Sequence, residues 1–442
     1  MPVLDNLAAY VCNASAADLP ADQRAALRDH GADCAIAFLA GSRSPEGKEL
    51  MALTDASSNV DKIATATAII RSTEVDDIHL GSCTTPSSVA VPAAIMLSGD
   101  AESGEAWSDV ESAVLVGIET MVRFGLAING PSILYRGIWP TCFATPLAVA
   151  AVASRIWKLD RQQTTHALSL ALMMSAGRTG RFAGAPSGRW IVIKAGVAAG
   201  MEAAKAARAG YKGDPTLLDG DWIERAQGIS IQIDKLDANA DVSLALQGLC
   251  LKPFSTARQA LAPTQALMEL LDEGLQAESI QSIIVRVPQN YAAMISQPVN
   301  PDNRGSGYVS AGFQMALAAL RPAGLWDLDR SDIMHDPAIL AFAKKISVEA
   351  DPALQEFYPA QWPAEIEVVT AGHTFVRRVM DVRGDANRRL DLAQRQRKGH
   401  CLLNATFGVE GAAALWRAAS CAFDSASAMQ ELKAVMLAGF HA

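Results

Sequence analysis

One lysine stands out as a group that could move a proton. Lys194 lies in an Ala- and Gly-rich stretch with helical character, and its neighbours at helical spacing are all apolar: Trp190, Val197, Ala198 and Met201. Burial disfavours the ammonium form of lysine, and a lysine that releases its proton easily can act as a general base. The alternative is a lysine that passes an apolar stripe and places its charge in solvent.

A second segment groups acids, an imidazole and hydroxyls. EVDDIHLGSCTTPSS (74–88) places Asp77 and His79 ahead of Thr84 and Thr85. These groups could transfer protons or hold a polar substrate. The alternative is a polar loop that enters the next helix, with Thr85 or Ser87 as its cap. One histidine with dispersed carboxylates has no recognised metal-ligand spacing, so we expect no metal.

Two further segments supply phenol, indole and guanidinium groups. SILYRGIWPTCF (132–143) contains Tyr135, which can exchange a proton, Arg136, which can clamp a carboxylate, and Trp139. GRTGRFAGAPSGRW (177–190) carries Arg181 in a Gly-rich cationic loop just before Lys194. This loop lacks the Gly-Lys-Ser/Thr ending of a P-loop, and no GxGxxG follows a strand, so we expect no nucleotide or other cofactor.

The last candidate segment, KPFSTARQALAPTQA (252–266), contains Arg258 and Gln259. The character of the sequence changes beside it. Upstream, the chain reads as successive helices, including one with a capping-box start at Ser108 and Gly125 as its C-cap, and one starting at Asp160 with Gln163. Downstream, 282–288 and 364–385 indicate strands, the latter two strands around a turn at Ala371-Gly372, and 310–320 indicates a helix.

These patterns predict a mainly α protein with an α+β domain. We expect a large helical domain from both chain ends, residues 1–255 and 400–442, and a smaller inserted α+β lid domain, residues 256–399. The 442 residues are enough for two domains with sizeable cores. Ligand sites tend to form between domains, so we expect Lys194, Tyr135, Asp77, His79 and Arg258 to converge on one cleft.

Composition excludes several classes of function. The net charge of −9 argues against a nucleic-acid partner, although a few pocket arginines could still attract an anionic substrate. Seven scattered cysteines form no CxxC pair, and the N-terminal stretch lacks the features of a signal peptide. No apolar run is long enough to span a membrane. We therefore expect a cytoplasmic protein without membrane or nucleic-acid partners.

Four segments together resemble the MmgE/PrpD family over nearly the whole chain. They are EVDDIHLGSCTTPSSVAVPAA, GIWPTCFATPLAVAAVASRIWKLDRQQTTHALSLA, KAGVAAGMEAAKAARAGYKG and KPFSTARQ, in the order and spacing of that family. The family includes 2-methylcitrate dehydratase, cis-aconitate decarboxylase and iminodisuccinate epimerase. The resemblance implies a helical domain with an α+β lid, usually in a homodimer, and a small polycarboxylate substrate.

The residues that differ from the family pattern bear on the reaction. A His-Pro-Ser of the dehydratases and decarboxylase is Thr85-Pro86-Ser87 here, and a Gly-Phe-His is Gly137-Ile138-Trp139. A Thr-His pair is replaced by Ala260 and Leu261, and a lid tyrosine by Phe313. The lysine is kept as Lys194 and the acidic pair as Asp76 and Asp77. Dehydration needs an acid for the departing oxygen, whereas epimerisation needs proton transfer on two faces of one carbon.

The pattern therefore favours a cofactor-independent epimerase of an amino-polycarboxylate such as iminodisuccinate. Lys194 would be one base, with Tyr135 or His79 as the acid on the opposite face and Asp77 assisting. The substrate would be held by Arg136, Arg181, Arg258, Gln259, Thr84, Thr85 and Trp139. The alternatives are a dehydratase or decarboxylase of a tricarboxylic acid that uses His79, and a catalytically inactive binding protein.

Overall fold

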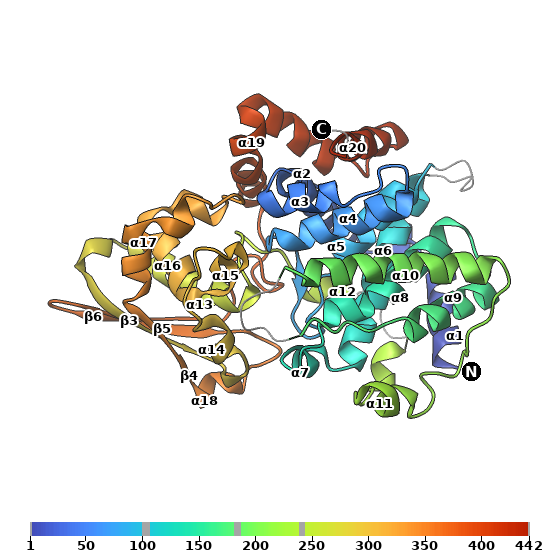
Figure 1. Ribbon diagram of the computed structural model, residues 1–442, viewed down its shortest axis with the longest axis horizontal. Helices are drawn as coiled ribbons and strands as arrows, with labels where there is room; N and C mark the ends of the chain where they lie inside the picture. The colour runs from blue at the N-terminus through green and yellow to red at the C-terminus, as the bar shows by residue number, and fades with distance from the viewer. Residues whose placement is uncertain (1, 100–106, 181–186, 238–243, 441–442) are drawn as a thin grey trace. The chain divides into compact units, whose positions relative to one another are not determined.

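The computed structural model describes residues 2–99, 107–180, 187–237 and 244–440. The chain folds into two compact units (Figure 1). The larger unit takes the chain up to Gly180, then Gly188–Leu249, then the chain from Thr406 onward. The main body of the smaller unit is Cys250–Ala405. No helix among the described residues has the length and hydropathy needed to span a membrane.

The larger unit is helical. Its helices are α1 (Val3–Asn13), α2 (Ala21–Gly41), α3 (Pro45–Ala52), α4 (Asn59–Ser72), α5 (Ser87–Leu97), α6 (Trp107–Ala127), α7 (Gly130–Leu134), α8 (Pro140–Ile156), α9 (Arg161–Met173), α10 (Arg189–Arg208), α11 (Trp222–Gln227), α12 (Leu244–Gly248) and α20 (Ala426–Ala438). Two short strands, β1 (Ile78–His79) and β2 (Leu249–Cys250), pair with each other. Helix α19 (Leu392–Ser420) runs from the smaller unit into the larger one and is interrupted at Gly408, where φ is 67°.

Helices α5 and α8 form the centre of the larger unit. Every residue of α5 is buried, and so is all of α8 except Arg155. Small residues allow the neighbouring backbones to approach: a Cβ on Gly117 of α6 would lie 2.5 Å from Val152 Cγ2 and 2.8 Å from Ala90 Cβ. The alanine and glycine content of the sequence therefore has a structural use, which is close helix packing.

The smaller unit contains a four-stranded sheet in the order β4–β3–β5–β6. The strands are β3 (Ile280–Val287), β4 (Ile346–Ala350), β5 (Ala364–Thr370) and β6 (Thr374–Val379). The helices are α13 (Arg258–Asp272), α14 (Gln289–Ile295), α15 (Arg304–Val309), α16 (Ala311–Leu320), α17 (Pro337–Ala343) and α18 (Pro352–Gln355). β3 pairs in parallel with β4 and antiparallel with β5, and β5 and β6 form a hairpin.

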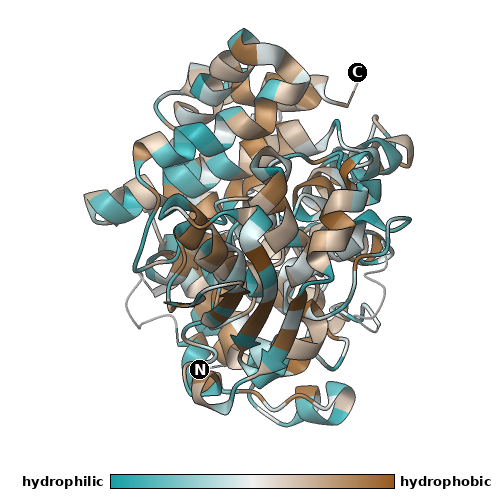
Figure 2. Ribbon diagram, turned by 90° about the vertical axis from the view of Figure 1, so that its left-hand side faces the viewer, coloured by the Kyte–Doolittle hydropathy of each residue, from teal (hydrophilic) through white to brown (hydrophobic). Residues whose placement is uncertain are grey.

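Alternation along the strands gives the sheet one apolar face. Ile283, Val285 and Val287 of β3 are buried, as are Ile366 and Val368 of β5, and brown hydrophobic residues follow the strands in Figure 2. Helices α13 and α14 contact these strands. The intervening residues carry surface ion pairs, such as that of Arg286 with Glu367 at 2.9 Å, so the sheet has an apolar side and a charged side.

Most of the expected elements are present. Asp160 and Gln163 form a capping box at α9, Ser310 caps α16, and the hairpin turns at the expected Ala371-Gly372. The prediction for α6 is wrong at both ends, since Ser108 already lies inside the helix and Gly125 does not end it. Gly125 instead makes room for a neighbouring loop, because a Cβ there would lie 2.7 Å from Thr84 Cγ2.

Candidate active site

Lys194 reaches from α10 to α4, which packs beside it. Its Nζ donates a hydrogen bond to Thr65 Oγ1 at 2.8 Å and lies 3.1 Å from Asp61 Oδ1. Asp61 and Thr65 are one turn apart on α4, so both face the same side of that helix. The lysine side chain is 12% exposed and the aspartate side chain 29%, so this ion pair is shielded and still connected to solvent.

The apolar neighbours of Lys194 on α10 are only part of its surroundings. Trp190, Val197 and Met201 are buried as expected, but the amine itself meets a carboxylate and a hydroxyl. The reason is geometric, since helical spacing shows which residues share the face of α10 but not what the facing helix contributes. The amine of Lys194 is therefore held between an ion-pair partner, Asp61, and a hydroxyl that orients one of its N–H bonds, Thr65.

The partners of Lys194 are themselves held in place. Asp61 Oδ2 accepts a hydrogen bond from the backbone N–H of Asp55 at 2.6 Å. Thr65 Oγ1 lies 2.7 Å from Thr54 Oγ1, and Thr54 donates to the carbonyl oxygen of Leu50 at 2.8 Å. The N-terminal end of α4 therefore presents a fixed acceptor pair to the amine, which is the preorganisation that proton transfer requires.

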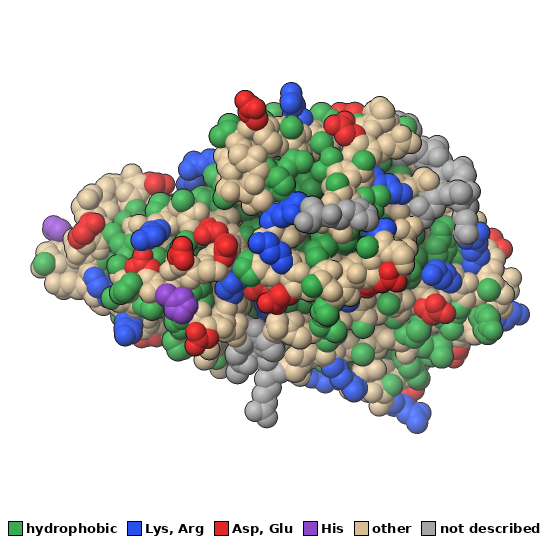
Figure 3. Space-filling view, turned by 45° about the horizontal axis from the view of Figure 1, so that its top comes forward, with side chains coloured by type: hydrophobic (Ala, Val, Ile, Leu, Met, Phe, Trp, Pro, Cys, Tyr) green, Lys and Arg blue, Asp and Glu red, His purple; other side chains and the backbone are tan. Residues whose placement is uncertain are grey.

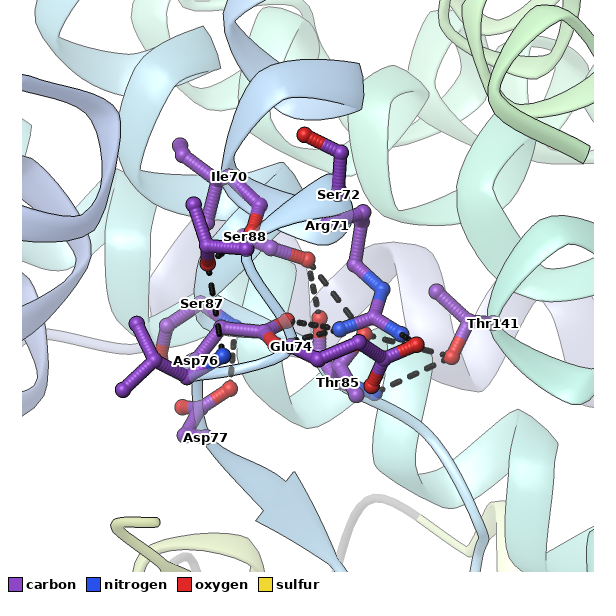
Figure 4. Close-up of polar contacts among 12 residues, drawn as sticks. Ile70, Arg71, Ser72, Glu74, Asp76, Asp77, Thr85, Ser87, Ser88 and Thr141 are labelled. Atoms are coloured by element: carbon purple, nitrogen blue, oxygen red, sulfur yellow. Dashed lines mark hydrogen bonds and ion pairs between the residues drawn. The ribbon is translucent and has the colours of Figure 1, made fainter. Parts of the chain in front are cut away.

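The other end of α4 carries a buried guanidinium. Arg71 forms an ion pair with Asp76 and lies 3.8 Å from Glu74, as the close-up in Figure 4 shows. Burial disfavours its charge, but the facing carboxylates Asp76 and Glu74 outweigh burial, and the pKa of Arg71 is raised. Arg189, the first residue of α10, shares Glu74 at 3.6 Å. The two arginines are thus joined through one carboxylate.

Two indoles pack against these arginines. The guanidinium carbon of Arg189 lies 4.3 Å from the ring centroid of Trp190 and 5.1 Å from that of Trp139. Arg71 lies 5.3 Å from the Trp139 ring, and the two indoles are 5.9 Å apart. We call Arg71, Glu74, Trp139, Arg189 and Trp190 the arginine–tryptophan cluster. Cation–π contacts hold the guanidinium planes in fixed orientations, which suits recognition of a carboxylate.

The cluster includes residues that the sequence reasoning missed. Arg71 was not singled out, and neither was Asp61 or Thr65. The sequence contained a signal for Arg71. This charged residue directly follows the run ATATAII, whose small and apolar residues indicate a buried end of the helix. A buried charge needs partners, and the acids that directly follow it, Glu74 and Asp76, were the nearest ones.

The loop between α4 and α5 is held in an unusual backbone conformation. Glu74 and Cys83 have φ values of 51° and 55°, in the left-handed region that is costly for residues other than glycine. Within the loop, Asp77 Oδ1 accepts from the backbone N–H of Ser87 at 3.3 Å, at the start of α5, and Oδ2 lies 3.1 Å from His30 Nδ1. Asp77 is thus committed to fastening the loop to α5 and α2.

His79 is held as a neutral imidazole. Its Nδ1 accepts a hydrogen bond from the backbone N–H of Ser82 at 3.1 Å, so Nε2 carries the proton. Burial lowers the pKa of His79 to about 4, although the nearby carboxylate of Asp77 acts in the opposite direction. The ring is packed against backbone, because a Cβ on Gly248 would lie 2.5 Å from Nε2. An imidazolium acid is therefore absent at neutral pH.

The hydroxyls of the same loop form two small networks. Thr84 Oγ1 lies 2.7 Å from Ser82 Oγ and is fully buried. Thr85 Oγ1 lies 3.2 Å from Thr141 Oγ1 of α8, and Thr141 also accepts from the backbone N–H of Thr85 (Figure 4). Thr85 is therefore tied to the first turn of α8, at the residue that follows Pro140.

The remaining predicted residues are placed as follows. Tyr135 is half-buried at the C-terminal end of α7. Arg136 is exposed and donates to the carbonyl oxygen of Gly228 at 3.1 Å, outside the arginine–tryptophan cluster, and its binding of a carboxylate stays a prediction. Arg181 lies outside the described residues.

Arg258 and Gln259 belong to the smaller unit, at the start of α13. Both side chains are buried, and Arg258 donates to the two oxygens of Asp385 at 2.9 Å and 2.6 Å. The guanidinium also lies 5.8 Å from the ring centroid of Trp362. The convergence of Arg258 with Lys194 in one cleft stays a prediction.

No group of three or more His, Cys, Asp or Glu side chains gathers as a metal-ligand set in the part of the chain that the structure describes. The acids of the candidate site are paired with cations or fasten the loop, as described for Asp61, Asp76 and Asp77. The donor set of this site therefore fits proton transfer and anion binding better than metal coordination.

Two family models match this sequence. Residues 63–227 match the MmgE/PrpD N-terminal domain, and residues 254–422 match the MmgE/PrpD C-terminal domain. The chain belongs to the MmgE/PrpD family. Members of this family are enzymes and include 2-methylcitrate dehydratases and epimerases. The mainly helical architecture with a small sheet region agrees with the fold of this family. No curated protein matches the chain.

Proposed function

We propose that this MmgE/PrpD protein is a cofactor-independent epimerase. It would remove and return a proton alpha to a carboxylate of an amino-polycarboxylate such as iminodisuccinate. The observation that carries the proposal is the pairing of Lys194 with Asp61 and Thr65, on the same two helices that hold Arg71 and Arg189. This arrangement offers one proton-transfer group and two cations for a carboxylate.

The contacts of Lys194 suit a reversible proton transfer, because its amine is held between a carboxylate and a hydroxyl. Epimerisation takes a proton from one face of a carbon and delivers another proton to the opposite face. As an ammonium, Lys194 delivers the proton for one epimer, and as a free amine it accepts the proton from the other. Asp61, 3.1 Å away and partly exposed, is placed to exchange that proton with solvent.

The arginines would stabilise the intermediate. Loss of the alpha proton leaves negative charge spread onto the adjacent carboxylate, and preorganised cations lower the energy of that state. Glu74 lies 3.6 Å from Arg189 and 3.8 Å from Arg71, longer than its direct hydrogen bonds would be. A substrate carboxylate could therefore approach these guanidinium groups without displacing the tighter Arg71–Asp76 pair.

The state of His79 supports the epimerase proposal over the lyase alternative. Dehydration needs an acid to protonate the departing hydroxyl, and the lyase alternative gave that role to His79. With a pKa of about 4 and with Nδ1 accepting from Ser82, His79 holds no proton to give at neutral pH as an imidazolium. We therefore assign the second acid to Tyr135 in preference to His79.

Proton NMR in deuterated water tests the proposal directly. The protein is incubated with a panel of polycarboxylates, including iminodisuccinate, citrate-type tricarboxylates and cis-aconitate. We expect deuterium to enter at a carbon alpha to a carboxylate without loss of water or carbon dioxide. Loss of water or carbon dioxide would instead establish the lyase alternative, and absence of turnover and exchange with every compound would indicate the inactive binding protein.

The resemblance to the family also carries a proposal on assembly. We expect a homodimer, which light scattering coupled to size-exclusion chromatography measures as twice the 46.7 kDa mass of one chain. A monomer at micromolar concentration would contradict this expectation.

A further inference from the structure

The smaller unit contains a cavity that the proposed epimerase reaction does not use. It lies among α13, the first turns of α19 and the segments 253–254 and 383–390, all of which belong to that unit. Its volume is about 110 Å³. The lining residues are Pro253, Phe254, Gln265, Met268, Trp326, Arg383, Leu390, Gln394, Arg397 and Lys398.

The polar part of this cavity is cationic. Arg383, Arg397 and Lys398 supply three positive charges, and no carboxylate is among the lining residues. The structure gives Arg383 and Arg397 no ion pair with any of the described residues, whereas most other arginines of this unit have one. Lys398 is buried and also has a partner within the protein, so Arg383 and Arg397 are the two cations of this wall that remain for a ligand.

Several contacts fix the shape of the cationic part. The side-chain oxygen of Gln265 accepts from the backbone N–H of Arg383 at 2.7 Å, and its amide group donates to Glu269 at 2.9 Å. The orientation of Gln265 is therefore assigned by both of its partners. The backbone of Arg383 is thus fixed by Gln265, while its guanidinium can bind an anion in the cavity.

The opposite wall is apolar. Phe254 and Trp326 meet edge to face with ring centroids 6.3 Å apart, and Met268 and Leu390 complete this side. Trp326 Nε1 donates to the carbonyl oxygen of Pro253 at 2.9 Å, which fixes the indole. A ligand here would place an apolar group on the aromatic wall and a negative group on the cations.

We propose that this cavity binds a small organic monoanion, a carboxylate with one aromatic ring or a short alkyl chain. At about 110 Å³ the cavity is smaller than the roughly 150 Å³ closed cavity that accepts benzene, but it is open to solvent on one side, so one ring or a short alkyl chain can enter while the carboxylate stays at the exposed Arg397. A guanidinium binds a carboxylate with two parallel hydrogen bonds, and Arg383 and Arg397 both present that group. The apolar wall disfavours a second or third carboxylate because those charges would lose hydration without partners. The ligand class therefore differs from the proposed polycarboxylate substrate.

Calorimetry on the full-length protein with benzoate as the probe tests this site. Benzamide serves as the neutral ligand of the same shape, and hexanoate as the alkyl carboxylate. We expect benzoate or hexanoate to saturate the site at about millimolar concentration. Benzamide should bind at least about tenfold more weakly, because it lacks the charge-assisted hydrogen bonds.

Substitutions locate the binding. Arg383→Gln and Arg397→Gln should each weaken binding of the carboxylate about tenfold or more. Arg417→Gln, on the same helix α19 at a position that does not line the cavity, is the matched control and should bind as the unchanged protein does. Circular dichroism confirms that all three variants are folded. The tryptophan fluorescence of the protein should change on binding, and this change should be absent in the Trp326→Phe variant.

Three results would overturn the proposal. They are absence of saturable binding by both carboxylates, equal affinity for benzoate and benzamide, and unchanged affinity in the Arg383→Gln, Arg397→Gln double variant. Because the assay measures binding and not turnover, its outcome is independent of whether the protein is an epimerase.

Discussion

A lysine in an active site can act either as a proton donor and acceptor or only as a positive charge that stabilises an anion. Lys194 has contacts that fit both roles. Asp61 at 3.1 Å stabilises the cation, and Thr65 at 2.8 Å fixes the direction of one N–H bond. A role that depends on charge alone would survive replacement by arginine, whereas a role in proton transfer would not. Substitution at this position therefore distinguishes the two.

We predict that Lys194→Ala and Lys194→Arg both lose turnover. A well-placed general acid or base contributes about 10²–10⁴-fold in rate, and a guanidinium stays protonated and cannot replace it. The turnover number is measured together with circular dichroism, and Lys158→Arg at an exposed position is the control. If Lys194→Arg keeps more than about a tenth of the wild-type rate, Lys194 acts only as a positive charge.

His79 makes a prediction about stability and pH. Its pKa in the folded protein is lowered to about 4 by burial, against about 6.5 for an unperturbed histidine. Between these values the unfolded chain binds a proton at this residue and the folded protein does not. The contribution of the neutral His79 to the free energy of unfolding is therefore present above pH ~6.5. It is lost as the pH falls toward 4, and the total loss is about 3 kcal/mol.

Urea unfolding at several pH values between 4.5 and 7 measures this effect. The free energy of unfolding of His79→Asn should fall less steeply with decreasing pH than that of the wild-type protein. His373→Asn, at an exposed position of the hairpin turn, controls for replacement of a histidine as such. Parallel slopes for wild type and His79→Asn would show that the imidazole is not held neutral by the fold.

At the scale of elements, the sequence was most informative where a signal is local. The capping box at Asp160, the helix predicted over 310–320 and the two strands predicted within 364–385 depend on neighbouring residues, and all three are present. Strand β4 was not predicted, because Ile346–Ala350 is short and its parallel pairing with β3 is set by distant residues. Gly125 was misread because a helical glycine that admits a loop resembles one that ends a helix.

The candidate site shows the same limit. The sequence singled out Lys194 and the segment 74–88, because their residue types indicate proton chemistry. It could not predict Asp61 and Thr65 as partners, since those contacts depend on how α4 packs against α10. It also could not show that the carboxylate of Asp77 contacts His30 and accepts a hydrogen bond from the backbone at the start of α5. Residue chemistry was thus readable, whereas pairing across helices required the structure.

Gly125 carries the prediction that belongs to this scale. In Gly125→Ala the new Cβ would lie 2.7 Å from Thr84 Cγ2 and 2.8 Å from Ser82 Cβ, so the loop that holds His79 must shift. Overpacking of this kind costs about 1–3 kcal/mol, which exceeds the gain of up to about 1 kcal/mol from alanine in a helix. We expect a lower urea midpoint and reduced turnover.

Gly411→Ala is the matched control for this variant. Gly411 is also a helical glycine, and the only neighbour that a Cβ there would meet within 4 Å among the described residues is Phe407 Cβ, at 3.2 Å on its own helix. Its urea midpoint should change little. If Gly125→Ala is as stable and as active as this control, the packing of the loop against α6 does not position the candidate site.

At the scale of the whole molecule, charge is distributed in two different ways. The net charge is −9, and on the face drawn in Figure 3 acidic and basic side chains are interspersed without a continuous basic area. Buried arginines are also present, namely Arg71, Arg123, Arg189, Arg258 and Arg330. An anionic substrate would therefore be recognised by local guanidinium groups and not by the overall field of the protein.

The last prediction concerns what the complete protein needs for turnover. In the proposed reaction, proton transfer between Lys194, solvent and substrate would require no bound ion, because the arginines would stabilise the negative charge of the intermediate. The acids that could hold a divalent cation already have partners: Asp76 pairs with Arg71, and Asp77 accepts from the N–H of Ser87 and contacts His30. The protein is dialysed against EDTA and then desalted to remove nucleotides. At least about nine-tenths of the activity measured by deuterium exchange should remain, whereas loss of a catalytic metal would lower the rate by about tenfold or more. Protein dialysed without EDTA is the control for losses in handling. If the dialysed protein is inactive and Mg²⁺, Mn²⁺ or Zn²⁺ restores it, the carboxylates of the loop 74–85 bind a metal in the working enzyme, and the charge of the intermediate is stabilised by that metal and not by the arginine–tryptophan cluster alone.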